Sequence, residues 1–371
     1  MAKKMLFLFV LLLSLTGMLK AQVTTAGMSG KVMADEESVI GATVVAVHEP
    51  SGTSYGTVTN VDGRFSLQGM RSGGPYKVTV SYIGYQTAIY TGIQLQLGET
   101  YSLNVTLHEA SELLGEITIT ASKSKFSAEK TGATTNISSE QLTTLPSINR
   151  SISDFTRISP YASGNSFGGR DGRSNTFTVD GANLNNNFGL SSGLPGGGNP
   201  ISLDAIDEVQ VVIAPYDVRQ ANFIGAGINA ITKSGTNAYR GSAYMYFNNE
   251  VMRGNKIGDT DFGARAEESK TVYGATFGGP IIKDKLFFFA NVEYEKSPQQ
   301  VITWRAAKEG EDPNNSTISR TTEADLAEFS QILKDKYGYN TGSFTDFPAD
   351  VTNLKLLGRI DWNINQGNKL S

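Results

Sequence analysis

The amino-acid sequence predicts a mainly β protein with a small α/β domain set between two β regions. Short alternating or apolar runs separated by turn residues fill residues 22–109, as in a β-sandwich. Helix and strand patterns mix around long polar loops in residues 137–236, which is typical of an α/β domain. From residue 237 onward, long alternating runs joined by short turns predict the first strands of a large antiparallel β-barrel.

Residues 1–21 have the pattern of a secretory signal peptide. Two lysines precede an apolar run from Met5 to Leu15, and Ala21 offers a cleavage position. The run is shorter than the about 20 residues that a membrane-spanning helix needs. We therefore expect the protein outside the cytoplasm. No later apolar run reaches that length, so entry into a membrane would require a barrel.

The composition excludes several classes of chemistry. The sequence contains no cysteine, so it forms no disulfide and no thiolate metal site. Its two histidines, His48 and His108, stand in different contexts without a second metal ligand at a suitable spacing. With a net charge of −4, the chain has no overall positive charge to attract nucleic acid. We therefore predict no metal, no cofactor and no nucleic-acid partner.

The first region reads as a sandwich of about 85 residues, a normal domain size. We expect strands in residues 42–49, 63–70, 76–85 and 101–109, joined as antiparallel hairpins by turns at 60–63 and 72–75. The core should contain Phe65, Val78, Val80, Val105 and Leu107.

The stretches GATVVAV, GTVTNVDGRFSL and YKVTVSYIGYQT resemble the carboxypeptidase regulatory-like sandwich found at the front of many outer-membrane receptors of Bacteroidota. That domain is an accessory fold, so the resemblance implies no peptidase activity.

The second region begins with helix signals. Ser138 and Gln141 form a capping-box pattern, and Pro146 should end that helix. Apolar residues on one face predict a second helix over 148–158. Strands are expected at 175–181 and 207–213, separated by a loop rich in Gly and Asn from 182 to 200.

This region resembles the plug domain of TonB-dependent outer-membrane transporters. The resemblance rests on Gly169–Arg170, on Val179–Gly181, on IDEVQVVIAPY (206–216) and on GAGINAITKSGTN (225–237). Many members of the family have Tyr-Gly where this chain has Arg219–Ala221. That departure, together with ITKSGTN, is most similar to the Oar-like subgroup. The resemblance implies that Arg170 and Asp180 pack the plug.

The last region follows the pattern of outer-membrane barrel strands. Candidate strands lie at 241–248, 271–279, 286–295 and 353–365, and an amphipathic helix is expected at 323–336 within a polar loop. In the last two strands apolar residues alternate with charged ones, which favours lipid on one face and water on the other.

FGGPIIKDKLFFFANVEYEK also resembles the first barrel hairpin of the same transporter family. Members of that family close with about 22 strands, whereas this chain supplies about four or five. We therefore expect a truncated barrel, in the N-terminal part of a longer protein.

A strand-like stretch lies between the first two regions, within a predicted linker at 110–136. GEITITA (115–121) alternates apolar and polar residues, but no turn residues on either side fold it back onto a neighbouring strand, so we expect an unpaired strand. Taken in isolation, the same stretch would also suit a last strand of the sandwich. It resembles the TonB box, which implies that its residues bind TonB. Those residues are Glu116, Ile117, Thr118, Ile119, Thr120 and Ala121.

The resemblance implies energised import across the outer membrane, with the sandwich and the box in the periplasm. TonB with its inner-membrane energising complex, outer-membrane lipid and an unidentified extracellular substrate would be the partners. Four asparagines of the 182–200 loop are substrate-binding candidates, although the same residues also suit turn geometry. They are Asn183, Asn185, Asn186 and Asn187.

Four other functions compete with uptake as interpretations of the sequence. A surface adhesion or structural β protein would need neither box nor plug, and a passive porin would lack the domain at 137–236. A carbohydrate-cleaving enzyme is disfavoured because Glu267 and Glu268 lie in a predicted loop without a cleft. A receptor that signals to an anti-sigma factor usually carries a different domain before the box.

Overall fold

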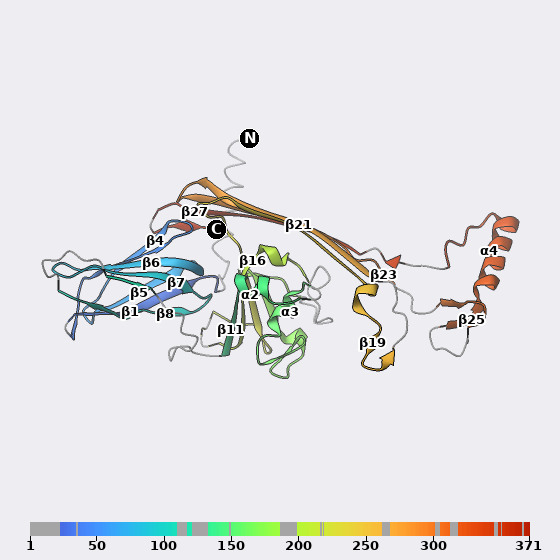
Figure 1. Ribbon diagram of the computed structural model, residues 1–371, viewed down its shortest axis with the longest axis horizontal. Coiled ribbons are helices and arrows are strands. Elements are labelled where there is room, and N and C mark those ends of the chain that lie inside the picture. The colour runs from blue at the N-terminus through green and yellow to red at the C-terminus, as the bar shows by residue number, and fades with distance from the viewer. Residues whose placement is uncertain are drawn as a thin grey trace, which may run out of the picture. The chain divides into compact units, whose positions relative to one another are not determined.

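The computed structural model, drawn as a ribbon in Figure 1, divides by its internal contacts into two compact units. The first contains Met1–Gly241, Thr276–Asn291 and Leu357–Ser371, and the second contains Ser242–Ala275 and Val292–Leu356. The predicted signal peptide lies outside the residues that the structure describes. Those residues are 23–34, 36–109, 117–120, 133–147, 150–185, 199–215, 217, 219–261, 268–300, 305–311, 318–344, 348–349, 351–365 and 367–371.

The N-terminal domain is a sandwich of two sheets. In one sheet β1 pairs with β2, β5, β8 and β9, and the other has the order β10-β7-β6-β3-β4. The strands are β1 (Ala26–Ala34), β2 (Glu37–Ser38), β3 (Thr43–His48), β4 (Thr53–Val58), β5 (Arg64–Met70), β6 (Gly73–Ser81), β7 (Ala88–Leu95), β8 (Thr100–Ser102), β9 (Val105–Leu107) and β10 (Ile117–Thr120).

The sandwich confirms most of the predicted pattern but not an all-antiparallel topology. β3 and β4 form an antiparallel pair, as do β6 and β7, whereas β8 and β9 run parallel to β1. The difference arises because the chain leaves β7 and crosses to the other sheet, where a parallel neighbour needs a crossover rather than a hairpin.

Both sheets contribute to one core, as expected from the alternation along each strand. All five predicted core residues are buried: Phe65, Val78, Val80, Val105 and Leu107. The predicted turn at 60–63 is present, since the Asn60 side chain accepts hydrogen bonds from the backbone N–H groups of Asp62 and Arg64. The second turn is shorter than predicted because β6 already begins at Gly73.

The second region, the middle domain, is built on a sheet of order β11-β16-β17-β14-β15 (Figure 1). β14 and β17 are parallel, and β16 pairs antiparallel with both β11 and β17. The elements are β11 (Ala133–Ser138), α2 (Ser139–Thr144), α3 (Ile152–Thr156), β12 (Ala162–Ser163), β13 (Ser166–Phe167), η2 (Gly172–Ser174), β14 (Thr176–Val179), β15 (Ala182–Asn183), η3 (Leu203–Ala205), β16 (Ile206–Ala214) and β17 (Gly227–Thr232).

Two predictions for the middle domain need correction. The linker was extended to residue 136, but β11 already pairs with β16 from Ala133 and places Ile137 in the core. The helix predicted over 148–158 is only α3, because Ser151 caps it through a capping box with Asp154. The capping box of Ser138 and Gln141 is present as predicted.

The last region supplies a sheet of order β18-β21-β22-β27-β28. Its strands are β18 (Arg240–Asn249), β21 (Ser269–Ile282), β22 (Leu286–Lys296), β27 (Thr352–Asn363) and β28 (Lys369–Leu370). The turns follow Ile282 and Asn363, close to the ends of the predicted strands 271–279 and 353–365. Within the first unit, Phe289 and Leu357 of these strands pack against the core of the middle domain.

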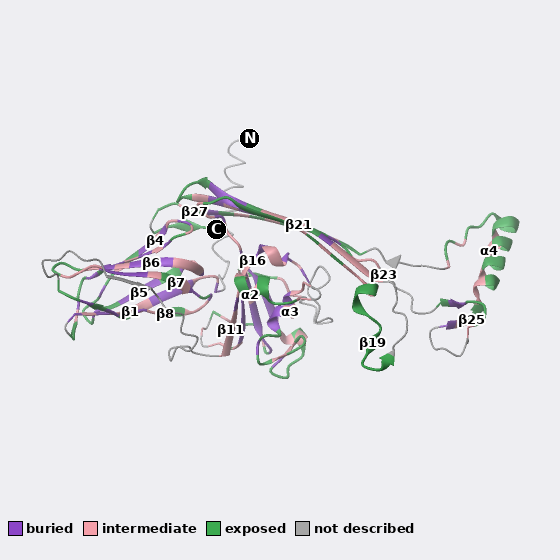
Figure 2. Cartoon of the chain, viewed as in Figure 1, coloured by how far each residue is buried: buried purple, intermediate pink, exposed green. Residues whose placement is uncertain are grey.

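Burial along these strands is inverted relative to a soluble sheet (Figure 2). On β27, Leu354, Leu356 and Ile360 are at least 60% exposed, whereas Asp361 is 1% exposed. On β22, Glu293 and Glu295 are buried while Val292 and Tyr294 are exposed. Apolar side chains therefore face outward and charged side chains inward, as predicted for strands between lipid and water.

The buried charges of the second unit are paired. Lys355 lies 2.8 Å from a carboxylate oxygen of Glu293 and 3.0 Å from one of Glu295, and Lys270 lies 2.7 Å from Glu295. The Tyr244 hydroxyl donates to Glu293 at 2.6 Å. Because each carboxylate has a cationic or hydroxyl partner, the burial of these groups is compensated.

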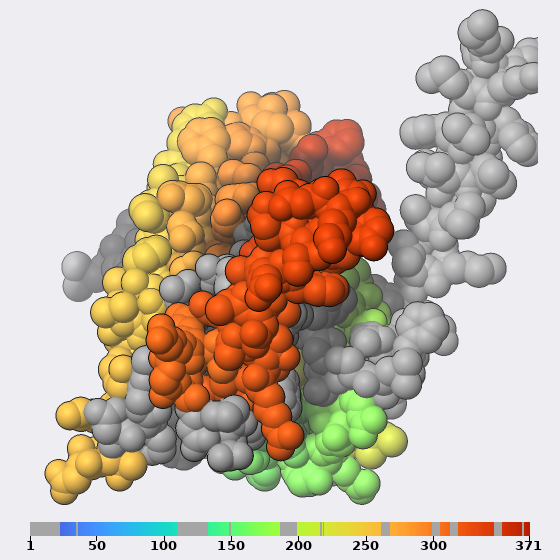
Figure 3. Space-filling model, turned by 90° about the vertical axis from the view of Figure 1, so that its right-hand side faces the viewer, coloured from blue at the N-terminus to red at the C-terminus, as the bar shows by residue number. Residues whose placement is uncertain are grey.

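The second unit also contains short strands and one longer helix. The predicted helix is present as α4, capped by Thr322 and with no buried residue, and Figure 3 shows it on the surface. No helix among the described residues is long and apolar enough to cross a membrane. The remaining elements are η4 (Glu250–Arg253), β19 (Lys256–Ile257), β20 (Thr260–Asp261), β23 (Gln299–Gln300), β24 (Arg305–Ala307), β25 (Ile318–Thr322), α4 (Glu323–Tyr337) and β26 (Pro348–Ala349).

Replacing Gly30 on β1 should destabilise the sandwich. A Cβ there would lie 1.8 Å from the carbonyl oxygen of Leu103, so Gly30→Ala must displace backbone. We expect a loss of roughly 1–3 kcal/mol in the free energy of unfolding, measured by calorimetry. Gly56→Ala is the matched control, because its Cβ would meet its nearest neighbour at 4.0 Å. Equal effects of both substitutions would contradict this packing.

Candidate functional site

The segment predicted to be an unpaired strand is paired. β10 runs parallel to β7, with Ile117 opposite Ala88 and Thr120 opposite Thr91. The prediction of an unpaired strand was wrong, and the alternative of a last sandwich strand is confirmed. Absence of turn residues excludes only an antiparallel hairpin, whereas a parallel neighbour is reached by a crossover. Glu116 and Ala121, the outer residues of the predicted box, lie outside the described part of the chain.

β10 stands at one end of its sheet. No described strand pairs with its second edge, so the backbone N–H and C=O groups on that side face no strand within the described residues. Such an edge is a template for an added strand from another chain. Within the described part of the chain, the segment therefore has one edge paired with β7 and one edge without a paired strand.

Asp180, which the sequence placed among the packing residues, lies in a polar cluster of the middle domain. Its carboxylate accepts from the backbone N–H of Thr232 at 3.0 Å and from the Thr232 hydroxyl at 2.6 Å. Arg359 of β27 donates to Asp180 at 3.3 Å and to the Thr232 carbonyl at 2.9 Å. These contacts agree with a packing role for Asp180.

Arg359 also binds Asp361 on its own strand. Its Nε and Nη2 donate to Asp361 at 3.0 and 2.9 Å. The sequence indicated only that both residues belong to the polar face of their strand. It held no signal that they meet Asp180, because that contact joins residues 179 positions apart.

The asparagines predicted to contact substrate have local partners where the structure describes them. Asn183 accepts from the backbone N–H of Asn185 at 2.8 Å. Asn185 in turn accepts from the N–H of Phe177 at 2.6 Å and donates to the Asn175 carbonyl at 3.2 Å. Both side chains therefore shape the turn after β14. Asn186 and Asn187 lie outside the described residues, and substrate contact by this loop stays a prediction.

A backbone contact joins the sandwich to the middle domain. The N–H of Leu97 donates to both carboxylate oxygens of Glu208 at 3.1 Å, and the side chain of Gln210 donates to the Leu97 carbonyl. Burial raises the pKa of Glu208 to about 8, against the hydrogen bond from Leu97, which lowers it. Leu97 is fully buried, so both of its backbone polar groups depend on β16.

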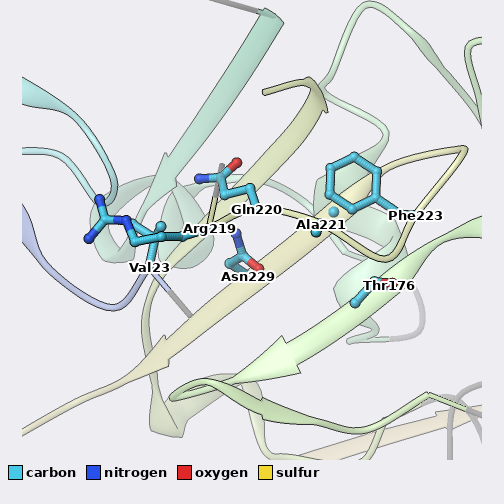
Figure 4. Close-up of a pocket in the computed structure, with 8 residues that line it drawn as sticks. Val23, Thr176, Arg219, Gln220, Ala221, Phe223 and Asn229 are labelled. Atoms are coloured by element: carbon cyan, nitrogen blue, oxygen red, sulfur yellow. The ribbon is translucent and has the colours of Figure 1, made fainter. Parts of the chain in front are cut away.

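A small cavity lies beside the segment that departs from the plug pattern. Arg219, Gln220, Ala221, Phe223, Asn229 and Thr176 line it together with Val23 and Gly227 (Figure 4). Its volume of about 250 Å³ includes space open to solvent, which is below the usual size of a ligand pocket. Among the described residues, no cluster of three or more His, Asp or Glu side chains could hold a metal ion.

Comparison with known proteins identifies two domains in the chain. Residues 27–108 match the carboxypeptidase regulatory-like domain, and residues 231–371 match an outer membrane beta barrel domain. The TonB-dependent transporter Oar of Myxococcus xanthus is 25% identical over 333 residues, which cover 85% of this chain and 30% of that protein. The chain thus spans less than a third of the length of this curated relative.

Two solved structures are similar to the chain. The siderophore receptor PirA of Acinetobacter baumannii is 20% identical with a TM-score of 0.39, over 63% of this chain and 29% of that one. The outer membrane transporter YddB of Escherichia coli is 15% identical with a TM-score of 0.39, over 63% and 31% of the two chains. These relatives are receptors and transporters rather than enzymes.

The pairing of β10 with β7 can be tested with engineered disulfides, since the sequence has no cysteine of its own. Thr91 and Thr120 are directly opposite, so Thr91→Cys with Thr120→Cys should oxidise readily. Thr91→Cys with Thr118→Cys is the control, offset by two positions along the strand. Mobility on non-reducing gels reports the bond, and equal yields from both pairs would contradict the register.

The contact at Glu208 should make stability depend on pH. Its pKa of about 8 lies above the ordinary 4.5, so the folded state keeps a proton that the unfolded chain releases. The stabilisation is complete below about pH 4.5 and is lost as the pH rises to about 8.

Glu208→Gln should remove this dependence, which we expect to be on the order of a few kcal/mol. Thermal unfolding midpoints measured between these pH values provide the test. Glu140→Gln, at an exposed position of α2, is the control and should keep the slope. A slope unchanged in Glu208→Gln would show that the carboxyl does not titrate in this way.

Proposed function

We propose that this chain, which belongs to the TonB-dependent receptors of the outer membrane, engages TonB through residues 116–121 to drive uptake of an extracellular substrate. Its outer-membrane location follows from the matched barrel domain and from its relationship to a TonB-dependent transporter. The binding of TonB, the gating by the middle domain and the nature of the substrate are parts of the proposal.

The observation that carries the proposal is the strand β10 (Ile117–Thr120), an edge strand of the sandwich that precedes the middle domain in the sequence. It presents an edge that is open within the described chain, at the position where a TonB box is expected from the sequence. A strand of TonB that adds to this edge gains main-chain hydrogen bonds without needing a pocket. Side chains of alternate residues would then provide specificity.

Force applied to the added strand would pass along the chain in both directions. Towards the N-terminus it reaches the rest of the sandwich, where Glu109 forms a backbone bridge with Tyr85. Towards the C-terminus it reaches β11, at one edge of the sheet of the middle domain. Pulling on β10 therefore loads the edge strand of the proposed plug, which is the strand that can leave without dividing the sheet.

The middle domain serves as the plug in this proposal. Phe289 of β22 lies in its core, Leu357 of β27 packs against that core, and Arg359 of β27 binds Asp180. These contacts support a plug that is seated against the barrel wall by both apolar packing and an ion pair. Opening a path for substrate would require some of them to separate.

A cysteine at Ile119 should crosslink to TonB. The full-length gene with Ile119→Cys is expressed with a TonB periplasmic domain that carries one cysteine, and disulfides are followed on non-reducing gels. We expect a specific crosslink at 119, because strand addition places two backbones about 5 Å apart. Ser66→Cys is the control, at an exposed position in the other sheet of the sandwich.

Cysteines at 117, 118 and 120 extend the test to the other residues of β10. Absence of a crosslink at all four positions, with the barrel assembled, would reject TonB binding. The adhesion or structural function considered from the sequence would then be favoured. A crosslink that increases when culture medium is added would indicate that the medium contains substrate.

A further inference from the structure

We propose that the sandwich is docked at the junction where the middle domain meets the strands of the last sheet, called here the barrel-type strands (β18, β21, β22, β27 and β28). In this proposal Arg71 is the positioning residue that fastens the sandwich to both. This inference goes beyond the uptake function, because it needs neither TonB nor a substrate. It assigns a role to a domain whose family match by itself indicates none.

Arg71 is held in place by the sandwich itself. It lies in the turn between β5 and β6, where its N–H donates to the hydroxyl of Tyr55 at 3.1 Å. Its carbonyl accepts from the hydroxyl of Tyr76 at 2.6 Å. Both tyrosine side chains are buried, and burial raises the pKa of each phenol, so both remain neutral hydroxyls. The turn is therefore preorganised.

The guanidinium of Arg71 reaches two different segments. Nη1 donates to the Ser234 hydroxyl at 2.6 Å, just after the last strand of the middle domain. Nη2 lies 3.5 Å from a carboxylate oxygen of Asp361 on β27. One side chain of the sandwich thus binds both the exit of the middle domain and a barrel-type strand, a bridging role that suits the fork of an arginine.

The ion pair between Arg71 and Asp361 is important because the carboxylate of Asp361 is buried. Asp361 is 1% exposed, and Arg359, its other cationic partner, is shared with Asp180. The carboxyl of Asp207 also interacts electrostatically with Arg71 and Arg359, together with Lys233. Loss of Arg71 would remove one of the two arginines that pair with the carboxylate of Asp361, which is 1% exposed, and that loss is unfavourable.

The hairpin turn between β3 and β4 makes a second set of contacts with the same junction. The Pro50 carbonyl accepts from the Asn237 N–H at 2.8 Å, and Thr53 accepts from the Asn363 side chain at 2.9 Å. Lys369 lies 3.2 Å above the ring of Tyr55, within range of a cation–π interaction.

Gly52 has a φ of +63°, and a Cβ there would lie 2.0 Å from a carboxylate oxygen of Asp284. Together with the Leu97 contact, three separate segments of the sandwich therefore touch the rest of the first unit. Docking at three places that are distant in sequence restricts rotation as well as translation, which a single contact does not.

Docking is tested in the full-length protein with the pair Thr53→Cys and Asn363→Cys. This pair should form a disulfide in the outer membrane, whereas Ser54→Cys with Asn363→Cys should not, because neighbouring residues of a strand point to opposite faces. Adding Arg71→Ala should slow the 53–363 bond roughly tenfold, as for a lost charge-assisted hydrogen bond. Arg64→Ala, an exposed arginine of β5, should leave the rate unchanged.

A second measurement tests whether Arg71 holds the middle domain in place, independently of whether the sandwich is docked. In cells that lack TonB, Arg71→Ala should raise sensitivity to vancomycin, which intact outer membranes exclude, because the middle domain is held less firmly. Arg71→Lys should restore only part of the barrier, since an ammonium group lacks the planar fork. Equal disulfide yields from the 53–363 and 54–363 pairs would overturn docking, and unchanged sensitivity in Arg71→Ala would overturn fastening. Neither result depends on TonB crosslinking.

Discussion

The buried carboxylate of Asp361 is the interaction on which the arrangement of the first unit depends. A carboxylate that is 1% exposed is stable only with cationic partners, and its two partners come from different parts of the chain. Arg359 belongs to the same strand and also binds Asp180 and Thr232 of the middle domain. Arg71 belongs to the sandwich and also binds Ser234. One charge on a barrel-type strand thereby connects three domains.

The inverted burial pattern of the strands explains why a charged side chain such as Asp361 is buried on them. Strands that expose apolar side chains must turn their polar residues inward, and those residues need partners there. In the second unit, lysines and glutamates on the strands pair with one another. In the first unit, the same polar face supplies Arg359 and Asp361, and the middle domain and the sandwich supply partners. The polar face of the strands therefore becomes a docking surface.

The two proposals assign complementary roles to the sandwich. One of its sheet edges holds β10, the segment expected to engage TonB, and its turns bind the junction near Arg71. A strand held by a docked domain is presented at a fixed position rather than at the end of a free linker. Under the two proposals, a pull on β10 would separate it from β7 over a pairing of only four residues, while the docked sandwich would resist displacement.

The sequence by itself determined the sandwich core from Phe65 to Leu107, the capping box of Ser138, the helix observed as α4, and the apolar and polar faces of the barrel-type strands. These features follow from local periodicity, turn and cap chemistry, which neighbouring residues encode. Only the tertiary structure decided that β10 pairs with β7, that β11 belongs to the middle domain, and that Arg71, Asp180, Arg359 and Asp361 meet. Those contacts join residues far apart along the chain, and no local pattern records which distant group will neutralise a buried charge or cover a strand edge.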